Sequence, residues 1–116
     1  MKTTPLKGMK DILPREQRIR DYVQGEILKT YRAAGFERIS TPIMEDMENL
    51  DKSDGGDNLN LIFKVLKRGD KLEKALASGS EKELSDMGLR YDLTLPLSRY
   101  YAANREQLPA PFKVIQ

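Results

Sequence analysis

The sequence predicts an α+β fold, because segments with helical and strand-like patterns alternate along one short chain. Apolar residues at three- and four-residue steps predict a long amphipathic helix between residues 14 and 34. Two segments rich in β-branched and aromatic residues, 36–41 and 61–66, predict strands. The 116 residues have about the length of one domain. We therefore expect a single small unit that combines helices with a sheet.

The first helix is expected to begin at Pro14, after an extended arm of residues 1–13. Proline suits the first turn because the backbone N–H that it lacks has no helical partner there. Glu16 is favoured by the helix dipole, and Gly35 suits the position just past the helix end. Such a helix must have its apolar stripe covered, by its own sheet or by a second subunit, and periodicity does not distinguish the two. The stripe consists of Ile19, Tyr22, Val23, Ile27, Leu28, Tyr31 and Ala34.

The middle of the chain predicts short elements separated by loops. Residues 36–41 alternate apolar and polar side chains and then meet Pro42, so a strand should end there. Residues 45–50 are compatible with a helical turn, and 61–66 form a dense apolar run typical of a buried strand. Residues 71–87 are polar and charged, and we expect a short helix followed by a mobile loop.

The last third predicts extended chain, a helix and a final strand. Residues 88–92 return to extended character, and a helix is expected from Thr94 to Ala103. Thr94 suits its N-cap, and Pro96 suits its first turn. Residues 112–116 begin a strand within which the chain stops, so we expect a piece of a longer protein.

Composition excludes several classes of function. Lys and Arg number 20 and Asp and Glu 18, so a net charge of +2 creates no strong field toward nucleic acids or membranes. The chain has no Cys and no His, which removes thiolate chemistry, the commonest general base and the commonest metal ligand. No apolar run approaches the roughly 18 residues that span a bilayer, and the start lacks a secretory signal. We therefore expect a cytoplasmic protein without membrane contact.

Three segments carry a family resemblance. Lys7–Pro14 reads KGMKDILP, similar to a K-G-x-x-D-x-L-P opening. The predicted helix and strand of residues 15–42 resemble motif 1 of class II aminoacyl-tRNA synthetases. Residues 89–94 read LRYDLT, similar to an R-x-[DE]-x-T segment that holds an amino acid substrate. In this order, the segments resemble the start of a histidyl-tRNA synthetase catalytic domain. The resemblance spans nearly the whole chain of residues 1–116.

The resemblance implies an antiparallel class II sheet flanked by helices. It also implies a homodimer through motif 1, with Pro42 at the end of the interface strand. The parent enzyme would use ATP and Mg²⁺, with histidine and tRNA(His) as its other partners. Motifs 2 and 3 and the anticodon-binding domain are absent from this sequence. We therefore assign no catalytic residue and no metal site, and expect the chain alone to be inactive.

Asp92, Leu93 and Thr94 are the candidate site residues. A carboxylate and a hydroxyl can accept hydrogen bonds from an ammonium group, and charge-assisted bonds are strong. On an extended segment, side chains two residues apart point the same way, and Leu93 would contribute only its backbone. Spacing alone favours the simpler interpretation that Asp92 or Thr94 caps a helix, whereas the resemblance favours substrate binding. Arg90 is expected to hold a nearby carboxylate, and Tyr91 to belong to the core.

Two further patterns have a simpler and a more specific interpretation. A basic run could contact tRNA phosphates, but interrupting acidic residues favour a solvated face. The Gly55-Gly56 pair lacks the spacing of a phosphate-binding loop, so we reject that function. The basic residues are Lys64, Lys67, Arg68, Lys71 and Lys74.

The resemblance implies that the parent enzyme forms histidyl-adenylate from histidine and ATP, and then transfers the histidyl group to tRNA(His). One alternative is a synthetase-like regulatory subunit of ATP phosphoribosyltransferase, which would sense histidine without catalysis. A weaker alternative is a stand-alone interaction domain. The sequence that follows Gln116 would discriminate among the three.

Overall fold

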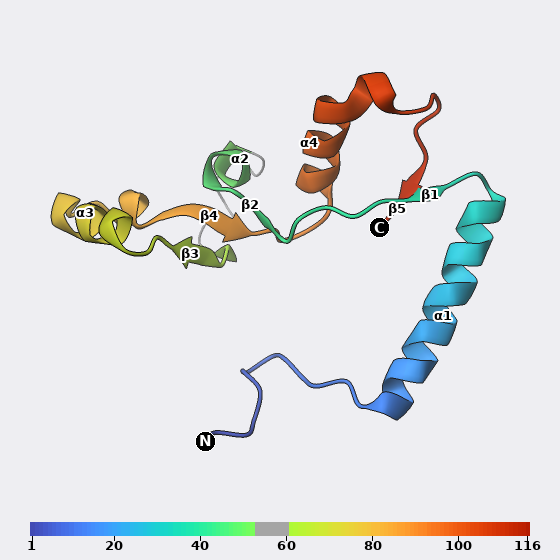
Figure 1. Ribbon diagram of the computed structural model, residues 1–116, viewed down its shortest axis with the longest axis horizontal. Helices are drawn as coiled ribbons and strands as arrows, with labels where there is room; N and C mark the ends of the chain where they lie inside the picture. The colour runs from blue at the N-terminus through green and yellow to red at the C-terminus, as the bar shows by residue number, and fades with distance from the viewer. Residues whose placement is uncertain (53–60) are drawn as a thin grey trace. The chain divides into compact units, whose positions relative to one another are not determined.

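The computed structural model describes residues 1–52 and 61–116 and divides them into two compact units (Figure 1). Residues 1–39 and 111–116 form the first unit, and residues 40–110 form the second. Helices and short strands occur in both, which confirms the predicted α+β class. The Gly55-Gly56 pair lies outside the described residues.

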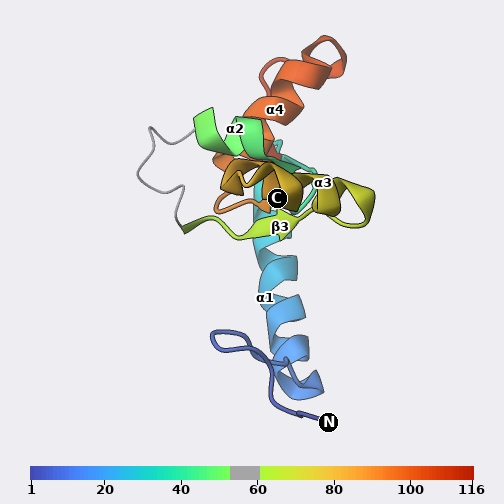
Figure 2. The ribbon, with the colours of Figure 1, turned by 90° about the vertical axis from the view of Figure 1, so that its left-hand side faces the viewer.

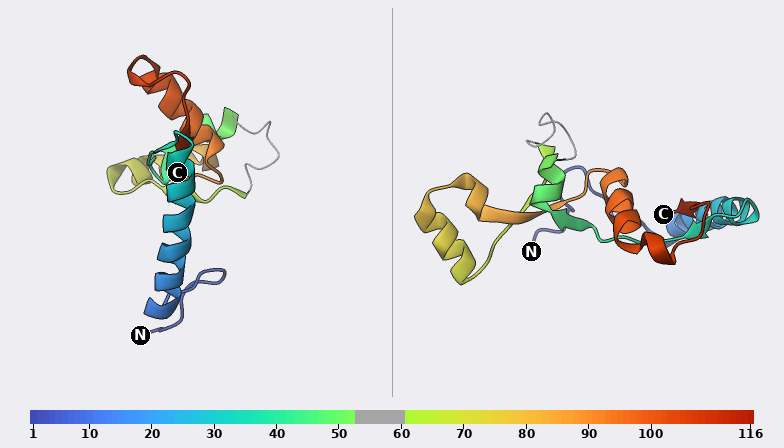
Figure 3. Two further views of the ribbon diagram at one scale, coloured as in Figure 1. Left: turned by 90° about the vertical axis from the view of Figure 1, so that its right-hand side faces the viewer. Right: turned by 90° about the horizontal axis from the view of Figure 1, so that it is seen from above.

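The first unit is dominated by helix α1 (Pro14–Ala33), which matches the predicted helix and is seen as one continuous helix in the left-hand view of Figure 3. Leu13 before it is extended, with φ −75° and ψ 159°, and Pro14 begins the helix as expected. Gly35 has φ +84°, a left-handed conformation that few residues other than glycine adopt. This turn directs the chain out of the helix and into the next strand.

A two-stranded pair completes the first unit. Strand β1 (Glu37–Arg38) runs parallel to β5 (Val114–Ile115), with Glu37 opposite Val114. Both predicted strands therefore exist, but β1 is shorter than residues 36–41 and the pair is parallel. A strand extends only as far as it has a hydrogen-bonded partner, and β5 pairs with β1 at only two residues.

The second unit contains a three-stranded antiparallel sheet in the order β2-β4-β3. Its strands are β2 (Met44–Asp46), β3 (Lys64–Leu66) and β4 (Ser85–Leu89). The antiparallel arrangement implied by the resemblance is confirmed here. The mobile loop expected in the second half of residues 71–87 is wrong, because residues 81–84 form a 3₁₀ turn and residues 85–87 begin the central strand. Pairing on both edges outweighs the weak strand propensity of Ser-Asp-Met-Gly.

Short helices flank this sheet. The predicted turn at 45–50 is only partly correct, since Glu45 and Asp46 belong to β2 and the helix follows them. The last long helix agrees closely with the prediction of 94–103. The helix of residues 70–78 and the 3₁₀ turn of residues 81–84 connect β3 to β4 and lie beyond one end of these two strands (Figure 3). The elements are α2 (Met47–Lys52), α3 (Asp70–Ser78), η2 (Glu81–Leu84), α4 (Thr94–Asn104) and η3 (Arg105–Gln107).

Helix α2 packs on one face of this sheet and forms the core of the second unit (Figure 2). Met47, Leu50 and Ile62 are buried together, and Leu95 of α4 packs against them. Gly88 of β4 lies beneath this cluster. A Cβ added there would stand 2.9 Å from Leu50 Cδ1 and from Met47 Sδ. The glycine thus lets α2 approach the central strand, and the same core supports the start of α4.

Candidate substrate-binding site

The predicted site residues form a tight turn at the start of α4. Asp92 Oδ1 accepts the backbone N–H of Thr94 at 2.9 Å, and Asp92 Oδ2 accepts the Thr94 hydroxyl at 3.2 Å. Leu93 between them has φ −103° and ψ 0°, so the segment is not extended. The two side chains therefore meet, as the spacing of two residues suggested, but across a turn rather than along a strand.

The geometry includes a capping contact, in a form different from the one expected. Thr94 is the first helical residue rather than the N-cap, and the N-cap residue Leu93 makes no side-chain capping bond. Asp92 instead satisfies the free N–H of Thr94. The helix start therefore uses one acceptor position of Asp92 Oδ1, and the Thr94 hydroxyl uses one of Oδ2.

This turn can accept hydrogen bonds from a cation. Asp92 and Thr94 are both exposed, so the carboxylate is not sealed inside the protein. Each carboxylate oxygen has more than one acceptor position, and the Thr94 hydroxyl donates its only proton to Asp92. The Thr94 oxygen can then act toward a ligand only as an acceptor. An ammonium group, with three donors and a positive charge, is complementary to such a pair.

Arg90, directly after β4, forms hydrogen bonds with residues 41–43, at the end of the predicted interface strand. Its Nη1 donates to the Thr41 carbonyl at 3.0 Å, the Thr41 hydroxyl at 2.8 Å and the Pro42 carbonyl at 3.2 Å. Its backbone N–H donates to the Ile43 carbonyl at 2.9 Å. We expected Arg90 to hold a carboxylate, whereas these bonds go to carbonyl and hydroxyl oxygens. They bring Pro42 and the candidate site segment together.

Sequence reasoning missed an ion pair between Glu45 and Arg99. Arg99 Nε lies 2.9 Å from Glu45 Oε2 and 3.0 Å from Oε1. The Glu45 side chain is only 3% exposed, whereas Arg99 is 37% exposed. No local pattern could have identified the pair, because its partners are 54 residues apart in the sequence.

The basic run lies around β3 and α3. Lys67 is half-buried, and its Nζ lies 3.7 Å from Glu83 Oε2. Two shallow hollows, of about 330 and 270 Å³, share Lys67 and Lys71 among their lining residues, together with acidic Asp86 in one and Glu83 in the other. The remaining members of the run are exposed. Mixed charge of this kind agrees with the solvated face favoured by the sequence.

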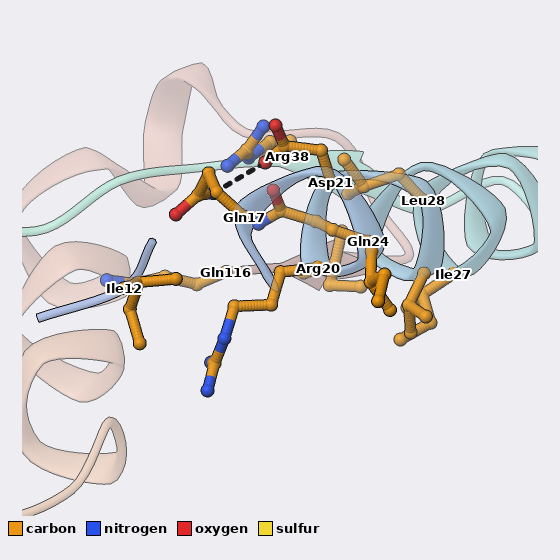
Figure 4. Close-up of a pocket in the computed structure, with 12 residues that line it drawn as sticks. Ile12, Gln17, Arg20, Asp21, Gln24, Ile27, Leu28, Arg38 and Gln116 are labelled. Atoms are coloured by element: carbon orange, nitrogen blue, oxygen red, sulfur yellow. Dashed lines mark hydrogen bonds between the residues drawn. The ribbon is translucent and has the colours of Figure 1, made fainter. Parts of the chain in front are cut away.

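The apolar stripe of α1 is not covered by its own unit. None of the residues of α1 is buried, and Tyr22 and Val23 are 71% and 49% exposed. A groove of about 660 Å³ runs along this helix, with Ile12, Arg38 and Gln116 also lining it (Figure 4). The sequence left open whether the stripe is covered by the sheet of its own chain or by a second subunit. The described residues of this unit do not cover it.

Membrane-spanning helices and clusters of metal ligands are both missing from the described residues. They contain no helix that combines the length and apolar character needed to cross a membrane. They also bring together no group of three or more side chains that could hold a metal ion.

Known proteins similar in sequence to this chain are described as histidyl-tRNA synthetases or histidine–tRNA ligases. The family model for histidyl-tRNA synthetase matches residues 8–115. A histidine–tRNA ligase from Leifsonia xyli is 45% identical over 116 residues, covering 97% of this chain and 27% of the relative. A probable histidine–tRNA ligase from Tropheryma whipplei is 41% identical and covers 100% of this chain and 27% of its own length. The chain thus spans about 27% of the curated relatives that it matches.

Solved structures agree with these relatives. The histidyl-tRNA synthetase of Nostoc superposes with a TM-score of 0.75 at 27% identity, over 97% of this chain and 23% of that protein. A protein described as an ATP phosphoribosyltransferase regulatory subunit/histidyl-tRNA synthetase, from Bacillus halodurans, gives a TM-score of 0.68 at 21% identity, over 98% of this chain and 25% of its own. The second likeness shows the fold alone. With the family model matching almost from end to end, the chain belongs to the histidyl-tRNA synthetase family.

Proposed function

We propose that this chain is the N-terminal part of the catalytic domain of a histidine–tRNA ligase. The full-length protein would join histidine to ATP as histidyl-adenylate, release pyrophosphate and pass the histidyl group to tRNA(His). The observation that carries this proposal is the exposed Asp92–Thr94 pair in the segment that resembles the family's amino acid-binding sequence. We expect this reaction to take place in the cytoplasm.

In this proposal the pair anchors the amino group of histidine. The Asp92 carboxylate balances the charge of the ammonium, and the Thr94 oxygen accepts a second hydrogen bond from it. Leu93 contributes its place in the turn, and its carbonyl already accepts the Leu97 N–H at 3.1 Å. A fixed amino group places the histidine carboxylate for attack on the α-phosphorus of ATP, and such positioning lowers the barrier of a two-substrate reaction.

The residues that hold ATP and Mg²⁺ are expected in the rest of the protein. Among the described residues of this chain, no group of three or more acidic side chains comes together to hold a metal ion. We therefore expect the isolated chain to form no adenylate.

We further propose that the full-length protein is a homodimer that covers the stripe of α1. Exposed apolar side chains along one helix face need a cover in water, and the groove beside α1 extends over the segment resembling motif 1. Pro42 would lie at the end of the interface strand. The carbonyl of Pro42 accepts a bond from Arg90, so this segment is linked to the substrate turn.

The decisive experiment is histidine-dependent ATP–pyrophosphate exchange by the full-length protein with Asp92→Ala. We expect the KM for histidine to rise about 10- to 100-fold, because a desolvated ammonium loses its charged partner. Asp70→Ala, at the exposed start of α3, serves as the matched control and should change nothing. An unchanged KM in Asp92→Ala would remove the pair from the site.

The same assay separates the regulatory alternative. A synthetase-like regulatory subunit would bind histidine, and Asp92→Ala would weaken that binding, but the full-length protein would catalyse no exchange. Exchange by the full-length wild type therefore decides between the two functions.

A further inference from the structure

Two arginines flank the substrate turn along the chain, and both are anchored to one short segment. Arg90 precedes the turn and binds the Thr41 and Pro42 oxygens. Arg99 follows the turn on α4 and binds Glu45. The turn at Asp92 is thus fixed from both sides onto residues 41–45, which lead into β2 and include its first two residues.

The Glu45–Arg99 pair is not an ordinary surface ion pair. The Glu45 side chain is 3% exposed, so its carboxylate has lost almost all contact with water. An ion pair with one partner buried and the other 37% exposed adds little stability over an apolar pair of the same size, since desolvation of the buried carboxylate offsets the attraction. What it supplies is direction: Arg99 Nε reaches both oxygens of Glu45 within 3.0 Å, which restricts how α4 can rotate.

The apolar contacts of α4 cannot supply that direction by themselves. Leu95 packs against the Met47, Leu50 and Ile62 cluster, and this contact holds the first turn of α4 close to α2. Apolar attraction is nearly independent of orientation, whereas hydrogen bonds prefer a narrow range of angles. The core, with Pro96 of α4 also buried, holds this helix close to α2, and the two-oxygen ion pair adds a directional constraint on its orientation.

Small changes of orientation matter at the turn. Thr94 begins α4 and Arg99 lies five residues later, about 7.5 Å along the helix axis at about 1.5 Å per residue. A tilt of about 10° around Arg99 would displace Thr94 by about 1.3 Å. Binding constellations tolerate only about 0.5 Å, and displacements of about 1 Å can cost much of the activity.

We propose that Glu45, Arg90 and Arg99 are positioning residues for the amino-group site formed by Asp92 and Thr94. They do not contact histidine, but they hold the acid and the hydroxyl where the ammonium of the substrate can reach both. This inference rests on the proposed function. It assigns a specific role in substrate binding to an ion pair that would otherwise serve only the fold.

The test uses the full-length protein with Glu45→Gln and, separately, Arg99→Lys and Arg90→Lys. In the exchange assay we expect the KM for histidine to rise about tenfold in each variant, with the KM for ATP unchanged. Arg99→Lys keeps the charge but loses the planar Nε–H that reaches both Glu45 oxygens, so it tests orientation even if Glu45→Gln fails to fold. Glu48→Gln, which breaks an exposed pair with Lys52 on α2, is the matched control and should leave both constants unchanged.

A substrate analogue separates positioning from general damage. Imidazolepropionate is histidine without its amino group, so it cannot use Asp92 or Thr94. Its inhibition constant should be the same in wild type and Glu45→Gln. Equal weakening of histidine and of this analogue would indicate a merely structural role and overturn the inference.

The inference and the proposed function fail differently. If Asp92→Ala raises the KM for histidine while Glu45→Gln and both arginine variants leave it within twofold, the positioning role is wrong and the site stands. If Asp92→Ala itself has no effect, the site assignment fails, and the positioning role fails with it.

Discussion

The two units of this chain differ in how their helices are covered. In residues 40–110, α2 buries Leu50 completely, and Met47 and Ile62 complete a small core. In the other unit, the 20 residues of α1 include none that is buried. The candidate site lies on the unit with its own core, whereas the unit with the uncovered helix offers a surface to be covered. The proposed substrate site thus belongs to the internally packed unit, and the proposed dimer surface to the unit whose helix is uncovered.

Truncating the core should have the largest effect on stability. Leu50→Ala removes a side chain that is 0% exposed, so we expect the free energy of unfolding to fall by about 2–5 kcal/mol. Ile27→Ala on α1, where the side chain is 46% exposed, should change it by about 0.5 kcal/mol. Urea denaturation followed by circular dichroism measures both. Equal losses would contradict the difference drawn between the units.

A charge on the α1 stripe should act on assembly. In the full-length protein, Val23→Lys should weaken self-association by about 2 kcal/mol, roughly 30-fold, because an interface would have to desolvate an unpaired charge. Sedimentation velocity over a concentration series measures the shift from dimer to monomer. Lys29→Gln on the same helix is the control. A dimer equally tight in Val23→Lys would place the interface elsewhere.

Two glycines offer a comparison within one experiment. Gly88→Ala would place a Cβ 2.9 Å from Leu50 Cδ1 and Met47 Sδ, so we expect a loss of about 1–3 kcal/mol. Gly25 on α1 has no such neighbour within 4 Å, and Gly25→Ala should gain about 0.5–1 kcal/mol from helix propensity. Thermal melts should therefore shift in opposite directions. Shifts of the same sign would show that the two helices are not packed as described.

The smallest effect concerns the exposed carboxylate of Glu16. Hydrogen bonds from Lys10 and then from Arg20 lower its pKa below the usual value of 4.5. A lowered pKa contributes stability above pH 4.5 that is lost as the pH falls through the folded-state value. Solvent and salt screen such a pair, so wild type and Glu16→Gln should differ only slightly at pH 7, and this difference should shrink as the pH falls below 4.5. Melting curves at low and high salt measure this, and a difference that grows toward low pH would reverse the sign.

Local signals in the sequence predicted what local physics determines. The limits of α1 followed from periodicity, Pro14 and Gly35, and the start of α4 was predicted to within one residue from Thr94 and Pro96. Strand β4 could not be predicted, because its Ser-Asp-Met-Gly segment becomes a strand only by pairing with β2 and β3. The parallel pairing of β1 with β5 and the Glu45–Arg99 pair depend on contacts between residues far apart in sequence, about which local patterns say nothing.

The candidate site shows the same division. The spacing of Asp92 and Thr94 predicted that their side chains point the same way, and in the structure the two side chains contact each other. The predicted backbone conformation was wrong, because a turn at Leu93 replaces the expected extended segment. Whether the pair binds an amino group stays a prediction, since a capping contact and a ligand contact can use different lone pairs of one carboxylate.

The single proton of the Thr94 hydroxyl, already given to Asp92, has a consequence for selectivity. A site made only of acceptors recognises molecules by the hydrogens they can offer. An acylated histidine, such as one within a peptide, carries a neutral nitrogen with one hydrogen in place of three. A proposed ligase with this turn would thus distinguish free monomers from histidine already built into protein, without any steric gate.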